Sequence, residues 1–215
     1  MEAVKGLILA VDTAGDGVSL ALGDGDKTWS ARRKVKAADE ALWPALEALL
    51  KKAEKRLSDV KGVACMTGPG RFTAVRIGVT FADTLARARG IPVVGLTRFE
   101  AFAPRLKGPG RSGLVVPTFR EESYLQIWTE RGPAAPATWV AANGLEAALA
   151  GATHVDVTAA SAEDLLAPAR ARLGATRLPP LRPLYLKPAN YVKPQPPSPS
   201  PTRRLAAEGR SPAGG

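Results

Sequence analysis

Cysteine and histidine are almost absent: the 215 residues include one cysteine, Cys65, and one histidine, His154. A disulfide framework or a structural zinc site with Cys and His ligands therefore cannot be assembled within the chain. Long apolar runs are absent too, because the run Leu7–Val11 ends at Asp12, too short for a signal segment or a membrane span. These absences predict a cytoplasmic protein with no membrane segment, and they leave open a carboxylate-bound magnesium ion.

Acidic residues are fewer than basic ones, 20 against 30, which gives a formal net charge of +10. A surface of this sign attracts polyanions, so nucleic acid or an acidic protein is the class of partner that the charge favours. The alternative is an ordinary solvated surface, because much of the excess is arginine in an alanine- and proline-rich sequence. The segment 193–215 has few apolar side chains and four basic residues against Glu208, which is typical of a disordered tail.

The N-terminal part of the sequence predicts a strand pair followed by a helix. Leu7–Ala21 reads as two apolar strands around a turn rich in Gly and Asp. Asp39–Lys55 has leucines at helical spacing and charged residues on the other side, which predicts an amphipathic helix with Pro44 in its first turn. The chain is 45% hydrophobic, which is enough for these elements to bury a core.

The next segment predicts a strand, a glycine-rich loop and a second helix. Gly62–Met66 is a short apolar strand that leads into Gly68-Pro69-Gly70. We expect Thr73 to cap the following helix and Gly90 to end it.

The remainder repeats this theme and predicts a mixed α/β fold. Two of its strands are close enough in sequence to form a second hairpin, and Ser161 with Asp164 has the spacing of a helix capping box. The expected strands are Pro92–Leu96, Gly113–Phe119, Ser123–Thr129 and His154–Val157, and the expected helices are Asn143–Leu149 and one after Ser161.

Two motifs are candidate ligand sites. In GPGRFTAVRIG, from Gly68 to Gly78, two glycines allow a sharp strand-to-helix turn that aims free N–H groups at a ligand. The alternative is a tight turn with Arg76 merely exposed, and the motif is neither a P-loop nor a Rossmann fingerprint. The turn at Asp12-Thr13 has a carboxylate and a hydroxyl suited to a phosphate or a magnesium-bound water, or it is an ordinary capped turn.

Other reactive or aromatic residues favour structural roles. Cys65 lies in an apolar strand with no histidine nearby in sequence, which indicates a buried thiol rather than a nucleophile. His154 likewise has no obvious partner as a general base. Trp43, Trp128 and Trp139 are more typical of core or interface positions than of a base-stacking platform, because they do not fall on neighbouring strands.

Four segments in the same order resemble the TsaB family, also called YeaZ. They are LILAVDTAGDGVSLALGDG from Leu7, GPGRFTAVRIG from Gly68, IPVVGLTRFEAFA from Ile91 and RPLYLKP from Arg182. The GPG-x-FT-x-x-RIG string is specific to that family, whereas the Asp-Thr hairpin is shared across the actin, sugar kinase and Hsp70-like (ASKHA) superfamily. The resemblance implies an ASKHA-type α/β fold of two related lobes, 1–102 and 103–192, followed by the tail.

The resemblance also implies a function. A TsaB-like chain is a noncatalytic scaffold that pairs with the catalytic subunit TsaD and, with the ATPase TsaE, supports threonylcarbamoyl transfer to adenosine 37 of tRNA. It implies that pairing uses the helices Asp39–Leu50 and Thr73–Arg87, with a homodimer when the partner is absent. The expected interface residues are Trp43, Leu46, Phe72, Arg76 and Phe81.

A nucleotide is expected only at the interface with the partner, as ATP or ADP with magnesium. The residues expected nearest to it are Asp12, Thr13, Gly68, Gly70 and Thr73. No catalytic residue and no resident metal are expected, because a single histidine cannot supply the pair of metal-binding histidines of the catalytic relative.

The chain departs from the family pattern at several positions, among them Thr118-Phe119-Arg120 where Asp-Ala-Arg is common. Arg71 replaces a serine, Ala74 a glycine and Ala38 a histidine. Two other functions stay open on the sequence alone. One is a free-standing ASKHA-type ATPase or phosphotransferase, suggested by Asp12-Thr13, and the other is a basic RNA-binding module, suggested by the net charge.

Overall fold

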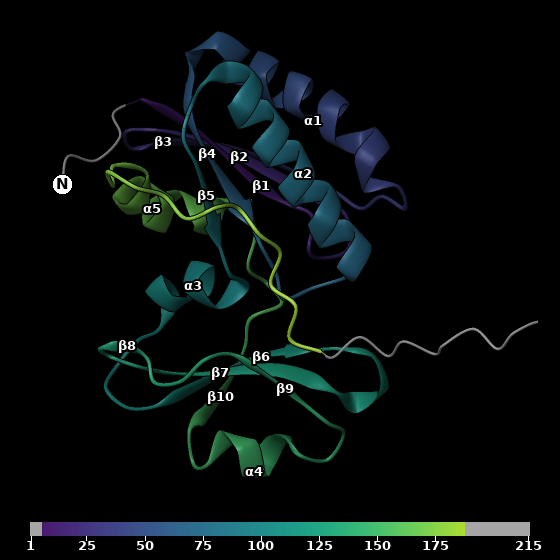
Figure 1. Ribbon diagram of the computed structural model, residues 1–215, viewed down its shortest axis with the longest axis vertical. Coiled ribbons are helices and arrows are strands. Elements are labelled where there is room, and N and C mark those ends of the chain that lie inside the picture. Colours follow the sequence, from purple (N-terminus) through teal and green to yellow (C-terminus); the bar gives the residue numbers. More distant parts are fainter. Residues whose placement is uncertain (1–5, 188–215) are drawn as a thin grey trace, which may run out of the picture.

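The computed structural model describes residues 6–187 and divides them into two α/β lobes (Figure 1). The predicted tail 193–215, and Pro188 at the end of the RPLYLKP segment, lie outside the described residues. The strands are β1 (Leu7–Asp12), β2 (Val18–Asp24), β3 (Lys27–Arg33), β4 (Val60–Met66), β5 (Val93–Leu96), β6 (Ser112–Pro117), β7 (Ser123–Thr129), β8 (Gly132–Pro133), β9 (Thr138–Val140) and β10 (Thr153–Asp156). The helices are α1 (Ala38–Lys52), α2 (Phe72–Arg89), α3 (Arg98–Phe102), α4 (Leu145–Leu149) and α5 (Ala162–Leu173).

The first lobe is built on a five-stranded sheet of order β3-β2-β1-β4-β5. The predicted hairpin is confirmed, since β1 and β2 pair antiparallel with Val11 opposite Leu20, and β4 and β5 continue the sheet in parallel. The edge strand β3 was not predicted, because its sequence KTWSARR carries mostly polar and charged side chains. Its backbone pairing with β2 alone makes it a strand.

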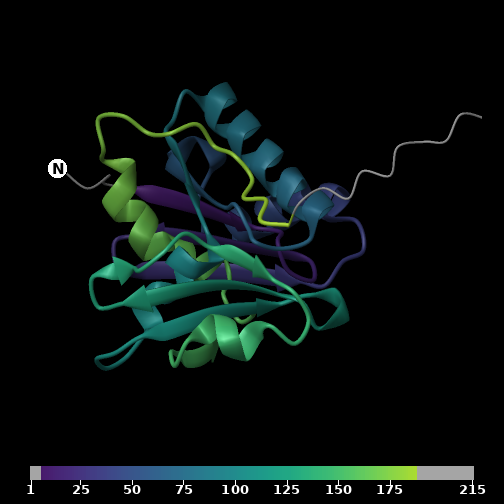
Figure 2. The ribbon, with the colours of Figure 1, turned by 60° about the horizontal axis from the view of Figure 1, so that its bottom comes forward.

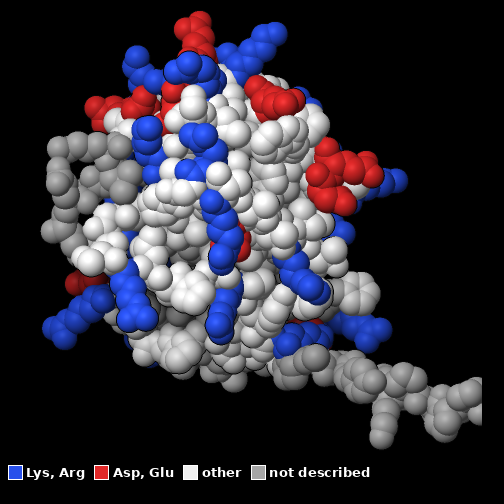
Figure 3. All heavy atoms as spheres, turned by 45° about the horizontal axis from the view of Figure 1, so that its top comes forward, with Lys and Arg blue, Asp and Glu red and all other residues white. Residues whose placement is uncertain are grey.

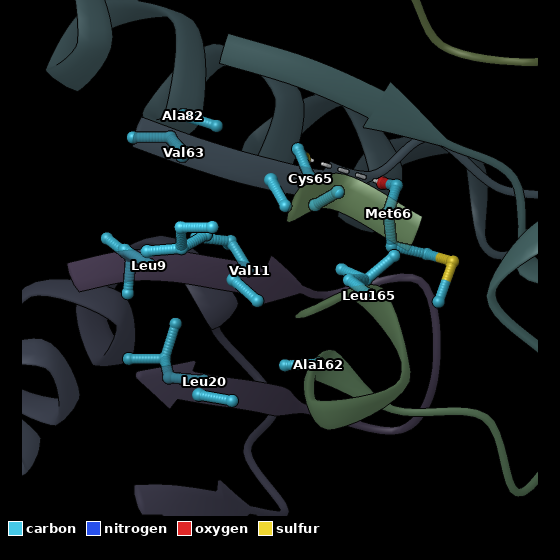
Figure 4. Packing of buried hydrophobic residues seen from close by; sticks show 14 of the residues in the cluster. Leu9, Val11, Leu20, Val63, Cys65, Met66, Ala82, Ala162 and Leu165 are labelled. Atoms are coloured by element: carbon cyan, nitrogen blue, oxygen red, sulfur yellow. Dashed lines mark hydrogen bonds between the residues drawn. The ribbon is translucent and has the colours of Figure 1, made fainter. Parts of the chain in front are cut away.

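Helices cover both faces of the first sheet. The pair α1 and α2 lies on one face, and α5 lies on the other although it follows the second lobe in sequence (Figures 1 and 2). Ala162 and Leu165 of α5 are fully buried against the strands, beside Val11 and Leu20 (Figure 4). A central strand such as β1 is therefore apolar throughout, because both of its faces are covered.

The second lobe repeats the hairpin-plus-parallel-strand theme of the first. Its strands β6 and β7 form the predicted second hairpin, and β10 pairs parallel to β6, as β4 does to β1. One face of this sheet packs on α4 through Val115, Leu125 and Val140. The other face meets Phe99 of α3, between the lobes. The segment 103–192 expected to form this lobe thus contributes α5 to the first lobe.

Two helix details differ from the predictions. Pro44 is the seventh residue of α1 rather than part of its first turn, because the helix begins at Ala38, whose register carries Leu42 into the core. Pro44 itself faces solvent, where the carbonyl that loses its helical hydrogen bond can be hydrated. Thr73 does not cap α2: the helix begins at Phe72, and the capping position is Arg71 with no side-chain hydrogen bond.

Two other predicted helix signals are confirmed. Gly90 ends α2 in the left-handed conformation with φ 61°. Ser161 and Asp164 form the predicted capping box of α5, with the Ser161 N–H donating to the Asp164 carboxylate at 2.8 Å.

Candidate functional site

The Asp12-Thr13 turn and the Gly68–Gly70 loop lie directly against each other. The Arg71 N–H donates to the carbonyl oxygen of Ala14 at 3.3 Å. A Cβ atom at Gly70 would lie 2.3 Å from that same oxygen, closer than any side chain can approach. Glycine at position 70 is therefore required by the contact between the turn and the loop, independently of any ligand.

Thr13 holds the first turn of α2 in place. Its hydroxyl donates to the carbonyl oxygen of Ala74 at 2.6 Å, and the residue is 1% exposed. A Cβ atom at Gly78 would lie 2.3 Å from the Thr13 hydroxyl oxygen, so this glycine admits the threonine. The Thr13 hydroxyl thus fixes α2 against the turn, which agrees with the ordinary structural turn given as the alternative to a ligand site.

Asp12 is buried beside the guanidinium of Arg98. The Asp12 Oδ1 atom accepts from the Ala14 N–H at 2.8 Å and lies 3.7 Å from Arg98 Nη2. Burial raises the pKa of Asp12, while Arg98 and the Ala14 N–H act in the opposite direction. The side chains at this turn do not fit a magnesium ion at Asp12, because a guanidinium already supplies the positive charge that the ion would bring.

A large cleft lies between the lobes and has a volume of about 690 Å³. Its walls carry basic and aromatic side chains. Phe119 is 79% exposed, and the Arg120 guanidinium lies over one face of its ring, 5.4 Å from the ring centroid. The charged and aromatic lining consists of Asp16, Arg71, Phe72, Arg98, Phe119, Arg120, Glu122, Tyr124 and Lys187. Such a volume is in the range of small-molecule sites.

The residues expected nearest to a nucleotide do not form one open site. Gly70 lines the large cleft, and Asp12 lines a smaller pocket on the other side of its turn. Thr73 is exposed and faces the groove between α1 and α2, and Thr13 is buried. Gly68 is buried, and its carbonyl oxygen accepts from the Arg98 N–H at 2.7 Å.

The α1/α2 face carries large exposed apolar side chains. Trp43 of α1 is 45% exposed and packs edge-on against Phe81 of α2, with ring centroids 6.1 Å apart. Beside them is a groove of about 440 Å³ lined by Asp39, Leu42, Thr73, Arg76, Ile77, Thr80 and Phe81. Figure 3 turns this upper part of the molecule toward the reader and shows Lys and Arg scattered over it among uncharged surface.

The interface residues predicted from the resemblance divide into an exposed set and one core residue. Phe72 is 57% exposed, stacks on Tyr185 with centroids 4.8 Å apart and lies 5.4 Å below the Arg76 guanidinium. Leu46 does not belong with them: it is 1% exposed, because its side of α1 packs on the sheet. It presents no surface to a partner.

Cys65 takes the structural role expected of it. Cys65 is fully buried in β4 among core side chains, where burial raises the pKa of its thiol (Figure 4). His154 is exposed on the edge strand β10. Within residues 6–187 there is no cluster of three His, Cys, Asp or Glu side chains that could hold a metal ion.

Three features of this site were missed at the level of sequence. Arg98, Phe119 and Tyr185 line or border the cleft, and although Arg98 and Tyr185 lie in segments that carry the resemblance, none was singled out as a site residue. The one local signal was Thr97 with Glu100, a capping box that opens α3 and fixes Arg98 as its first residue. Tyr185 reaches Phe72 because the Leu184 N–H donates to the Thr67 carbonyl oxygen at 2.8 Å, a contact between distant segments.

Comparisons with known proteins give a consistent answer. Residues 34–118 match the family model of TsaD, tRNA N6-adenosine threonylcarbamoyltransferase. The tRNA threonylcarbamoyladenosine biosynthesis protein TsaB of Escherichia coli is 33% identical over 98 residues, 45% of this chain and 42% of that protein. TsaB of Bacillus subtilis is 37% identical over 76 residues, 35% of this chain and 32% of that protein.

A transferase of Pelobacter propionicus is 39% identical over 72 residues, 33% of this chain but 21% of that enzyme. The chain thus spans less than half the length of these curated relatives. YeaZ from Pseudomonas aeruginosa superposes with a TM-score of 0.66 at 24% identity, over 84% of this chain and all of that chain. In these matches the chain is similar to the TsaB (YeaZ) proteins.

The solved structures show how much of this chain shares their fold. A second Pseudomonas aeruginosa protein, described as similar to peptidase YeaZ, superposes with a TM-score of 0.69 at 23% identity, over 85% of this chain and all of that one. Both lobes are therefore shared with these structures, and the two-lobe α/β fold predicted from the resemblance is confirmed. No helix in the described part of the chain is long and apolar enough to span a membrane.

Proposed function

We propose that this chain is a noncatalytic subunit that pairs with a TsaD-like transferase and supports threonylcarbamoyl transfer to adenosine 37 of tRNA. The observation that carries the proposal is the aromatic pair Trp43 and Phe81 on the uncovered α1/α2 face. The names of the TsaB relatives support the pathway, and the TsaD match supports the class of partner.

The α1/α2 face has the make-up of a protein interface. A tryptophan that is 45% exposed on a helix leaves a large apolar surface in water, and such residues are enriched at the energetic centres of interfaces. The adjoining groove offers Ile77 and Phe81 for burial, with Asp39 and Arg76 as charged residues at its edge. An apolar centre with a polar rim is the common pattern of a stable interface.

The chemistry of the first lobe supports a noncatalytic role for this chain. Cys65 is fully buried, and Asp12 is engaged by Arg98 and by the Ala14 N–H. We extend the proposal to a TsaE-like ATPase as a further partner, to ATP or ADP with magnesium at the shared interface, to a homodimer without the partner and to a cytoplasmic setting. Neither the free-standing ATPase nor the RNA-binding module is favoured by a specific contact or relative.

The binding experiment is co-purification with the TsaD-like protein of the same genome, followed by size-exclusion chromatography with light scattering. We expect a stable heterocomplex. Trp43→Ala should weaken it by about 30-fold, the loss typical of an interface hot spot. Phe119→Ala is the matched control, because Phe119 is an exposed aromatic residue in the second lobe and does not line the α1/α2 groove.

Two results would contradict the pairing. One is separate elution of two folded proteins, and the other is equal weakening by the Trp43 and Phe119 variants. The role in catalysis is tested by tRNA modification in a mixture of the TsaD-like and TsaE-like proteins with and without this chain. We expect modification to require this chain, whereas ATP hydrolysis at ordinary enzyme rates by the pure chain would contradict a noncatalytic role.

A further inference from the structure

The described chain ends in a segment, residues 178–187, that runs from the first lobe to the second without forming a helix or a strand (yellow in Figures 1 and 2). We call this segment the strap. Within residues 6–187, the chain passes between the lobes at two other places, through α3 toward β6 and through residues 157–161 toward α5. The strap is therefore a third connection between the lobes.

The first-lobe end of the strap is held by apolar packing and by its backbone. Leu181 packs against the first core, and the Leu184 N–H donates to the Thr67 carbonyl oxygen at 2.8 Å. One residue further, the Tyr185 ring stacks on Phe72 at the start of α2, with ring centroids 4.8 Å apart. Loss of any one of these contacts leaves the others in place, so this end of the strap is firmly attached.

The second-lobe end of the strap is held by an apolar contact and an ion pair. Leu186 is partly buried against the cluster that contains Leu114 of β6. The Lys187 ammonium donates to the Glu122 carboxylate at 2.5 Å and lies over the Trp139 ring, 5.4 Å from its centroid. The Trp139 indole N–H donates to the same carboxylate oxygen at 3.2 Å. The ion pair is therefore the main polar attachment of the strap to the second lobe.

This ion pair joins the two walls of the large cleft. Lys187 and Glu122 both line the cleft, the first on a segment attached to the first lobe and the second directly before β7. The other two connections lie beside each other, because Arg98 Nη1 donates to the carbonyl oxygens of Thr158 at 3.2 Å and Ala160 at 3.4 Å. Two neighbouring connections form a hinge about which lobes can turn, whereas a third connection restricts that turn.

We propose that the strap locks the two lobes over the cleft and that the Lys187–Glu122 pair is its releasable end. The side chains of this pair are 39% and 17% exposed, so water and salt compete with the contact. The attachments of Leu181, Leu184 and Tyr185 are apolar or backbone contacts, which salt does not screen. Release therefore starts at Lys187 and frees the second lobe to turn while the strap stays on the first. This inference is independent of the pairing with a TsaD-like protein.

The test is a distance measurement between the lobes by pulsed electron paramagnetic resonance. Glu47→Cys on α1 and Glu146→Cys on α4 place nitroxide labels at exposed positions of opposite lobes, while Cys65 is buried and stays unlabelled. Dilution with unlabelled chain restricts the measurement to distances within one molecule. We expect one narrow distance when the strap is intact. Lys187→Ala should raise the population at other distances by about three- to tenfold, because it removes an exposed ion pair and a cation–π contact.

Lys55→Ala is the matched control. Lys55 pairs with the Asp24 carboxylate at 2.9 Å and lies over the Trp29 ring, 6.0 Å from its centroid, but all three residues belong to the first lobe. Its loss should leave the distance unchanged, and Lys187→Arg, which keeps the charge, should retain the narrow distance. Sodium chloride at about 1 M, where the Debye length is about 3 Å, should act on the intact strap as Lys187→Ala does and add little to that variant.

A second variant, Tyr185→Ala/Lys187→Ala, weakens both ends of the strap and should broaden the distance distribution further. Circular dichroism checks that this variant is folded, and if it is not, Lys187→Ala decides alone. An unchanged narrow distance in folded Lys187→Ala, at low and at high salt, would overturn the proposal. Equal broadening by Lys55→Ala would overturn it as well, because it would indicate general loosening of the chain rather than release of the strap.

Discussion

Arg98 holds its Nη2 atom 3.7 Å from Oδ1 of Asp12, and the two residues are 3% and 5% exposed. The pair joins the end of β1 to the start of α3, two elements far apart in sequence. Taking both charges out of water is costly: burial raises the pKa of Asp12, and the Arg98 guanidinium acts to lower it. The contact between the first hairpin and the region between the lobes therefore depends on both residues together.

Replacing one member of this pair should destabilise the chain more than replacing both. Arg98→Leu leaves Asp12 buried without a counter-charge and should lower the free energy of unfolding by about 3–5 kcal/mol. Asp12→Asn keeps an oxygen to accept from the Ala14 N–H, so the double variant should recover part of that loss. Urea unfolding of both single variants and the double variant measures the coupling, and strictly additive effects would rule out the pair as a unit.

Gly70→Ala should destabilise the chain by about 1–3 kcal/mol, the usual cost of overpacking. Its Cβ atom would meet the Ala14 carbonyl oxygen at 2.3 Å, and a backbone atom cannot rotate away. Gly15→Ala, in the turn that Gly70 contacts, is the matched control, because its Cβ atom would lie 3.8 Å from Arg98 Nη2, an ordinary contact distance. Thermal unfolding compares the two variants, and equal melting temperatures would show that the approach is not as close as described.

Glu100 ties α3 to α5 and should make stability sensitive to acid. Its carboxylate accepts from Arg172 Nη2 and from the Thr97 N–H, each at 2.7 Å. Burial acts to raise the pKa of Glu100, but these contacts outweigh it and hold the pKa below its ordinary value of 4.5. Because the folded-state pKa is the lower one, the stabilisation is present above pH 4.5 and is lost as the pH falls through the folded-state pKa.

Glu100→Gln should therefore lower the free energy of unfolding at pH 7. The expected loss is only a few tenths to about 1 kcal/mol, since Arg172 is partly exposed. The difference from the unmodified chain should shrink as the pH falls below 4.5 and through the folded-state pKa. Glu47→Gln, at an exposed position of α1, is the control. Urea unfolding at several pH values gives both curves, and a difference that grows in acid would contradict the sign of the pKa shift.

Cys65 should be unreactive in the folded protein. Burial raises the pKa of its thiol, so very little thiolate forms near neutral pH, and the side chain is fully buried. A disulfide exchange reagent should label it at least about 100-fold more slowly in native buffer than in denaturing urea, since opening of the core must come first. Rapid labelling of the native chain would show that β4 opens easily or that the thiol has a different environment.

Local patterns predicted the elements whose signals lie within a few residues. The hairpin from Leu7, the end of α2 at Gly90 and the capping box at Ser161 each depend on short-range chemistry, and each is confirmed. Thr73 failed as a cap because the start of α2 is fixed by a distant contact, the hydrogen bond from Arg71 N–H to Ala14. A side-chain rule cannot detect a helix start that another segment determines.

The site was less predictable than the fold for the same reason. Leu46 and Trp43 lie on one helix three residues apart, yet one is in the core and the other in solvent. Arg98 resembles any exposed arginine in the sequence, and only the packing of α3 between the lobes buries it beside Asp12. The edge strand β3 has no apolar alternation, so its pairing with β2 could be found only in three dimensions.

The position of α5 affects how the chain can fold during synthesis. The first sheet needs Ala162, Leu165 and Leu173 to cover its second face, and these residues are made after the entire second lobe. A nascent chain that has reached only Phe102 therefore exposes one apolar side of a finished sheet to the ribosome surface and to chaperones. Loss of residues 162–173 by early termination would therefore destabilise the N-terminal lobe. A fragment that ends between the lobes lacks a helix that the first sheet needs, so the first lobe is not an independent folding unit.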